Sequence, residues 1–82
     1  MMKIRILFFA AYRELLGRGE LTMEMPEGST VAELLQALWG REGPYGLLPA
    51  APVVAVNRDF ASLETRLEDG DEVAFIPPVA GG

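Results

Sequence analysis

The printed sequence closes with Asp69-Gly-Asp-Glu-Val-Ala-Phe-Ile-Pro-Pro-Val-Ala-Gly-Gly82, and this stretch decides how the rest of the chain is interpreted. Asp69-Gly70 is typical of a tight turn, because glycine adopts positive φ at little steric cost. Residues 72–76 then alternate as a strand does, and Val73 and Phe75 are expected on one face of it. A turn and a final strand are therefore predicted before the prolines.

The two prolines at 77 and 78 have no N–H to donate, so the sheet is expected to end there. Consecutive prolines favour an extended path, and the residues after them carry very little side chain. A backbone this slim could enter a narrow channel in another protein and deliver the carboxylate of Gly82. The alternative is a frayed chain end. We expect a domain of residues 1–76 and an extended, flexible tail made of Pro77, Pro78, Val79, Ala80, Gly81 and Gly82.

Composition limits the class of protein. The chain has 82 residues, half of them hydrophobic, which suffices for one small domain with one core. It has no His and no Cys, which excludes disulfides, the usual zinc sites and the commonest general base, so no metal site is expected. The net charge of −5 argues against nucleic acid as a partner. Without a signal-peptide layout or a long apolar run, we expect a cytoplasmic location and no membrane partner.

Two strands and a short helix are expected in the first third of the chain. Residues 3–9 alternate, residues 10–16 are compatible with a helix that Gly17 ends, and residues 20–26 alternate again. The short connection favours an antiparallel pair of strands. The side chains expected to face the core from these strands are Ile4, Ile6, Phe8, Leu21, Met23 and Met25.

Thr30 and Glu33 have the spacing of a capping box, which predicts the start of the main helix. A single apolar stripe follows and is expected to pack on the sheet: Val31, Leu34, Leu35, Leu38 and Trp39. Gly40 and Gly43-Pro44 are expected to end the helix.

A loop, a strand and a turn are expected between the main helix and the final strand. Residues 40–52 read as a loop anchored by Tyr45, Leu47 and Leu48, and residues 53–56 as a short buried strand. Asn57-Arg58-Asp59 is a turn signal, and an irregular segment with Leu63 and Leu67 on the core is expected after it.

One helix with one apolar stripe needs one sheet face to cover it, which indicates an α+β roll with a mixed sheet. The first and last strands both carry continuous apolar content and are expected as parallel neighbours at the centre. Leu7, Phe9, Ala74 and Ile76 would then form an outward apolar patch, which we interpret as a docking surface for partners. The alternative is that the chain's own loops cover it.

Two stretches and a short link between them carry a resemblance to a known family. They are Ile6-Leu-Phe-Phe-Ala-Ala-Tyr-Arg-Glu-Leu-Leu-Gly17, residues 69–82, and Val54-Ala-Val-Asn57. The chain resembles the small, sulfur-carrying subunit of molybdopterin synthase, which has the ubiquitin-like β-grasp fold with a protruding Gly-Gly tail. The resemblance spans essentially the whole chain, and the tail is its most specific part.

The resemblance implies a carrier without catalytic side chains of its own. Gly82 would be adenylated by a ubiquitin-activating-like adenylyltransferase, which uses ATP, and converted to a thiocarboxylate with sulfur from a donor protein. The tail would insert into the large synthase subunit and give sulfur to a cyclic pyranopterin monophosphate. No cofactor would be bound by the chain itself. Three alternatives stay open: a sulfur carrier for the thiamine thiazole or for tRNA thiolation, a ubiquitin-like protein modifier, or an inert interaction domain.

Overall fold

The computed structural model describes residues 1–77. The sequence expectations for Pro78, Val79, Ala80, Gly81 and Gly82 lie outside the described residues. The chain forms, in order, β1 (Met2–Phe8), α1 (Ala10–Leu16), β2 (Glu20–Met25), α2 (Val31–Trp39), the 3-10 helix η1 (Pro44–Leu47), β3 (Val53–Val56), β4 (Asp59–Ala61) and β5 (Glu72–Ile76).

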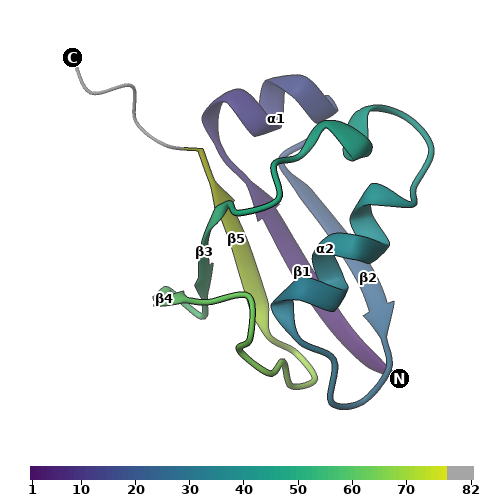
Figure 1. The fold of residues 1–82 in the computed structure, drawn as a ribbon, viewed down its shortest axis with the longest axis vertical. Helices are drawn as coiled ribbons and strands as arrows, with labels where there is room; N and C mark the ends of the chain where they lie inside the picture. The colour runs from purple at the N-terminus through teal and green to yellow at the C-terminus, as the bar shows by residue number, and fades with distance from the viewer. Residues whose placement is uncertain (78–82) are drawn as a thin grey trace.

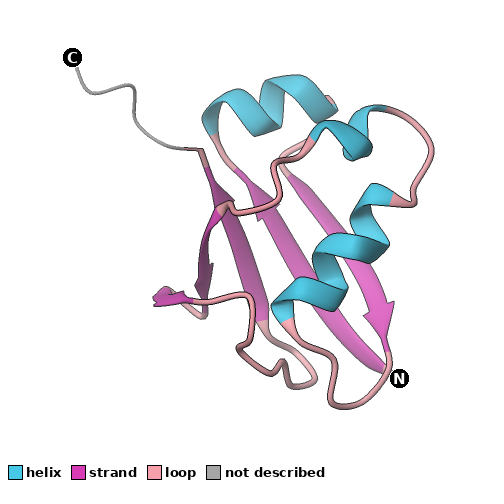
Figure 2. Ribbon diagram, in the orientation of Figure 1, coloured by secondary structure: helices cyan, strands magenta, loops and turns pink. Residues whose placement is uncertain are grey.

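The five strands form one mixed sheet in the order β2-β1-β5-β3-β4, with the helices on one side of it (Figures 1 and 2). The β1–β5 pair is parallel, and the other three pairs are antiparallel. This confirms the expected antiparallel pair at the start and the expected parallel neighbours at the centre. The first and last strands of the sequence therefore lie side by side.

The core lies between the sheet and α2. The expected alternation of β1 is confirmed, since Ile4, Ile6 and Phe8 are buried, and so is that of β5, where Val73 and Phe75 are buried. The apolar stripe of α2 faces them and is buried as predicted, and Trp39 is half-buried at its end. The Trp39 indole N–H donates to the carbonyl oxygen of Leu48 at 2.9 Å, which ties the end of α2 to the loop after η1.

Both predicted helix signals form. The Thr30 hydroxyl accepts from the N–H of Glu33 at 3.3 Å, and the Glu33 carboxylate accepts from the N–H of Thr30 at 3.1 Å. This is the reciprocal capping box that satisfies two otherwise unpaired donors. Gly17 ends α1 with φ 73°, in the left-handed region that glycine tolerates best.

Three sequence expectations are wrong in detail. β4 takes in Asp59, which was expected in the turn, and residues 60–61, which were expected in an irregular segment, because all three pair with β3 across a two-residue turn. Leu47 is no anchor and is 69% exposed, because η1 turns Tyr45 and Leu48 inward, three residues apart, and leaves Leu47 outside. Val53 is exposed at the start of β3, which is buried only from Val54 onward.

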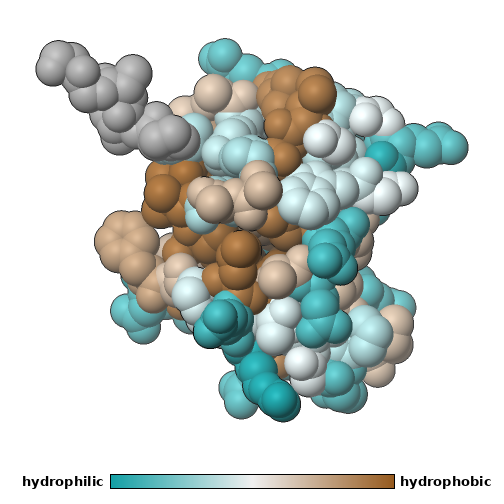
Figure 3. All heavy atoms as spheres, in the orientation of Figure 1, coloured by the Kyte–Doolittle hydropathy of each residue, from teal (hydrophilic) through white to brown (hydrophobic). Residues whose placement is uncertain are grey.

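The face covered by helices is not uniformly polar (Figure 3). In the space-filling view, hydrophobic surface shows at the top over α1 and on the side of β3 and β4, and hydrophilic residues gather along the right and lower rims. Within residues 1–77, no helix is long and apolar enough to cross a membrane.

Candidate docking groove

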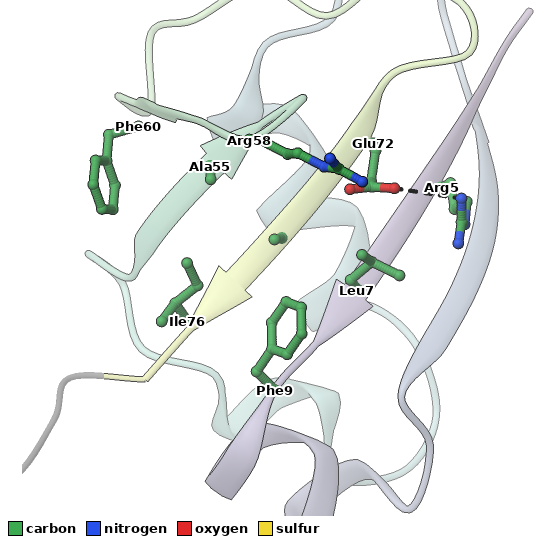
Figure 4. A pocket seen from close by; sticks show the side chains of 9 residues that line it. Arg5, Leu7, Phe9, Ala55, Arg58, Phe60, Glu72 and Ile76 are labelled. Atoms are coloured by element: carbon green, nitrogen blue, oxygen red, sulfur yellow. Dashed lines mark ion pairs between the residues drawn. The ribbon is translucent and has the colours of Figure 1, made fainter.

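The other face of the sheet carries a groove of about 450 Å³. It runs over the central strands, with residues from β1, β3, β4 and β5 around it (Figure 4). Its lining consists of Arg5, Leu7, Phe9, Ala55, Arg58, Phe60, Glu72, Ala74 and Ile76. All four residues of the predicted apolar patch belong to this set.

The register of the sheet explains why the surface is hollow. Leu7 is level with Ala74, Ala74 with Ala55, and Ala55 with Phe60, so these four form one row across four strands. The two middle members are alanines, and the two outer members are large. Side chains in such a row stand roughly perpendicular to the sheet. Small residues between large ones therefore leave the floor low and the walls high.

The predicted patch residues differ in exposure. Phe9 is 46% exposed, Leu7 and Ile76 are half-buried, and Ala74 is buried as part of the floor. Phe9 follows the last residue of β1 with extended backbone (φ −115°, ψ 156°) and begins α1, so its side chain stays on the outer face. Leu7 is not covered by a loop and lines the groove.

Sequence reasoning missed five lining residues, of which Phe60 is the most exposed large hydrophobic residue in the described part of the chain, at 83%. It lies on β4, a strand too short to show an alternation. A usable signal was present in Asn57-Arg58, because two residues between Val56 and Asp59 make a two-residue hairpin loop. Recognising the hairpin would have placed Phe60 opposite Ala55, on the outer face.

Charged groups occupy one end of the groove. The Arg5 guanidinium lies 3.1 Å from a Glu20 carboxylate oxygen and 3.3 Å from one of Glu72. Arg5 and Glu72 are directly opposite each other in the parallel β1–β5 pair, so the register of the sheet brings their side chains together. These side chains are partly exposed, so the ion pairs contribute little to stability and mainly define the charge pattern. Glu20 and Glu72 are therefore both engaged with Arg5.

The opposite end of the groove is where the tail begins. Ile76 ends β5, and the half-buried Pro77 follows it directly. Figure 4 shows Phe9 and Ile76 at this end and Arg5, Arg58 and Glu72 at the other. The groove is therefore apolar near the tail and charged away from it. Among residues 1–77, no cluster of three or more acidic side chains could hold a metal ion.

A five-stranded mixed sheet in the order 2-1-5-3-4, with one main helix across it, defines a ubiquitin-like β-grasp protein. The chain belongs to the ThiS family, whose model matches residues 6–82. The match includes both stretches that carried the resemblance, and it continues through the Gly-Gly end.

Curated relatives cover the chain nearly completely. The molybdopterin synthase sulfur carrier subunit of Escherichia coli K12 is 40% identical over 83 residues, with 96% of this chain and 99% of the relative aligned. That of Chlamydomonas reinhardtii is 35% identical over 83 residues, with 99% and 100% aligned. The small archaeal modifier protein 3 of Haloferax volcanii is 33% identical over 92 residues, with 99% and 100% aligned.

Solved structures agree with the fold. A Pyrococcus furiosus protein assigned as molybdopterin converting factor subunit 1 superposes with a TM-score of 0.82 at 30% identity, covering 96% of this chain and all of that one. A chain from the complex of subunits 1 and 2 of the Helicobacter pylori molybdopterin-converting factor gives 0.70 at 27% identity, covering 99% and 100%. The β-grasp fold predicted from the sequence is thereby confirmed.

Proposed function

We propose that this chain is the sulfur carrier of molybdenum cofactor biosynthesis. The observation that carries the proposal is the family match through residue 82, joined to relatives that are named molybdopterin synthase sulfur carrier subunits. The groove supports it, because an apolar surface beside the start of a slender tail suits a protein that docks first and inserts its tail second.

The chemistry centres on the carboxylate of Gly82. A free carboxylate is a poor acyl donor, so the activating partner transfers AMP from ATP to it and releases pyrophosphate. Sulfide-level sulfur (HS⁻) from a donor protein then attacks the acyl carbon of the adenylate, the bond to AMP breaks, and a thiocarboxylate remains. In the large synthase subunit this sulfur is transferred to the cyclic pyranopterin monophosphate. Gly81 keeps the approach unhindered, and Pro77 to Ala80 span the path into the partner.

This assignment explains how a chain without Cys or His takes part in sulfur chemistry. The reactive sulfur is carried on the backbone terminus, and the catalytic side chains belong to partners. The carrier supplies recognition and reach. We accordingly assign the large synthase subunit, the adenylyltransferase and a sulfur donor as partners, in the cytoplasm, with no cofactor bound to the carrier.

The decisive measurement is the intact mass of the chain after incubation with the activating enzyme, ATP and a sulfur donor. We expect an increase equal to the replacement of one oxygen by sulfur, confined to the peptide that ends at Gly82. Transfer is then followed with the large subunit and the cyclic pterin. A terminus left unmodified, under conditions that convert an established carrier, would reject the proposal.

The docking role of the groove is tested with Phe9→Ala and Ile76→Glu. Both should weaken binding to the large subunit while unfolding stays cooperative, since neither side chain is fully buried. Leu15→Ala is the matched control, because Leu15 is a comparably exposed hydrophobic residue, at 39%, that does not line the groove. Equal affinities for all three variants would remove the docking role from this face.

A protein-modifier function is the second candidate, favoured by the similarity to the Haloferax volcanii small archaeal modifier protein 3. Activation of Gly82 would be shared, but the acyl group would pass to a lysine amine instead of to sulfur. Mass spectrometry of tryptic peptides from cells of the source organism distinguishes the protein-modifier function from the sulfur-carrier function. Trypsin makes its last cut in this chain after Arg66, so a modified lysine would carry residues 67–82. Such a remnant on lysines that disappears when this chain is deleted would establish the modifier function.

A further inference from the structure

Arg58 has a left-handed backbone conformation, which is unfavourable for arginine. Asn57 and Arg58 are the two central residues of the β3–β4 hairpin, with φ values of 50° and 73°. Left-handed backbone of this kind favours asparagine at the first position and glycine at the second. An arginine there carries a conformational cost that glycine would avoid. Strain of this kind, observed directly, is a reason to look for a function of the side chain.

The hairpin is fastened to β5, so the position of Arg58 is well defined. The Asn57 side-chain amide N–H donates to an Asp71 carboxylate oxygen at 2.9 Å, and its amide oxygen accepts from the N–H of Glu72 at 3.0 Å. The Asn57 backbone N–H donates to the Glu72 carbonyl oxygen at 2.8 Å. Three hydrogen bonds from one residue hold the turn over the start of β5. Figure 4 shows the Arg58 side chain lying across β5 towards Glu72.

The charge of Arg58 is not neutralised within the part of the chain that the structure describes. The ion pairs among residues 1–77 involve Arg5 and the N-terminal amine, and none includes Arg58. Glu72 pairs with Arg5 instead, at 3.3 Å. Glu20 also pairs with Arg5, at 3.1 Å, so both carboxylates at this end of the groove are engaged with Arg5 and not with Arg58. A local cation on an acidic protein favours a local anion on its partner.

We propose that the protein that receives the tail fills this groove with apolar side chains and places a carboxylate against Arg58. The inference rests on the proposed function and adds that the interface has an apolar end and a charged end. Apolar partner groups would lie near Phe9 and Ile76, where the tail begins. The carboxylate would lie at the far end, about 13 Å away, since Glu72 and Ile76 are four residue steps apart along β5. A guanidinium suits this role because it can bind a carboxylate through two parallel N–H bonds.

The experiment measures binding of the large synthase subunit to the full chain at several salt concentrations. R58A should weaken the affinity about tenfold at low salt and flatten its dependence on salt. R18A removes the same charge from an exposed arginine outside the groove, so it is the matched control and should stay within about twofold of the unmodified chain. The affinity of R58K should lie between those of R58A and R18A, because lysine keeps the positive charge but lacks the two parallel N–H donors of the guanidinium.

R58G separates binding from stability. Glycine relieves the strain at φ 73°, so the chain should unfold at the same or higher urea concentration while binding weakens as it does in R58A. Equal affinities and salt slopes for R58A, R58G and R18A would overturn the role of Arg58 and leave the sulfur-carrier proposal intact. No binding of the large subunit by the unmodified chain would overturn both the docking proposal and this inference.

Discussion

Phe75 is completely buried, and its ring stacks on that of Phe8 with the centroids 6.0 Å apart and the planes inclined by 18°. Both residues come from the central parallel pair of strands, where they are level with each other. The alternation of residues 72–76 was enough to predict which face of β5 is inside. The reason is that a strand has a period of two, so one buried residue fixes the facing of all the others.

Phe75→Ala should lower the free energy of unfolding by about 3–5 kcal/mol, through lost burial and the cavity left behind. Urea unfolding followed by circular dichroism measures this. Ile76→Ala is the control on the opposite, half-buried face and should cost clearly less. A small loss for Phe75→Ala would contradict the facing of β5.

Tyr12 gives the fold a dependence on alkaline pH. Burial disfavours the charged phenolate and raises the pKa of Tyr12 above its ordinary value of 10.0. The folded state therefore keeps its proton to higher pH than the unfolded state. The contribution of Tyr12 to stability is fully present below the unfolded pKa and is lost as the pH rises through the folded pKa.

Tyr12→Phe should make the free energy of unfolding less sensitive to pH between about pH 9 and about pH 11. Urea midpoints of both proteins across this range give the two slopes. Other groups that titrate in the same range affect both proteins alike, so the difference between the slopes isolates Tyr12. Parallel slopes would mean that the Tyr12 hydroxyl titrates as it does in water.

At the scale of elements, α2 depends on signals that are local in sequence, and for that reason it could be predicted. Thr30→Ala removes the side chain that accepts from the N–H of Glu33 and should reduce the free energy of unfolding by about 0.5–2 kcal/mol. Thr30→Ser keeps a hydroxyl at the same place and should retain most of the stability. Chemical denaturation of the two variants provides the comparison. If serine destabilises as much as alanine, the threonine methyl group rather than the hydroxyl is responsible.

β4 shows where prediction from sequence stops at this scale. Its three residues have no periodicity of their own, and they are extended only because β3 supplies hydrogen-bond partners. The groove has the same origin, since Ala55 and Ala74 are neighbours only through the pairing of β3 with β5. The patch residues of β1 and β5 were predictable from each strand separately. Phe60 and the hollow floor required the strand order, which no single segment contains.

At the scale of the molecule, the domain and the tail are expected to act independently. Deleting Gly81 and Gly82 should leave the unfolding midpoint unchanged, because β5 ends at Ile76 and the core lies before it. The truncated chain should still bind the large subunit through the groove, yet gain no sulfur when treated with the activating enzyme, ATP and donor. Binding by calorimetry and intact mass report the two properties separately. Sulfur loading of the truncated chain would place the reactive group elsewhere.

The central position of β5 has a consequence for synthesis of the protein. A ribosome makes β1 and β2 first, and these can pair as a hairpin while most of the chain is still missing. The other edge of β1 stays without hydrogen-bond partners until residues 72–76 emerge, because β5 alone occupies that edge. An unfinished chain therefore exposes an apolar strand edge that invites pairing with other nascent chains. Completion of the sheet closes this edge with the same strand that leads directly into the tail.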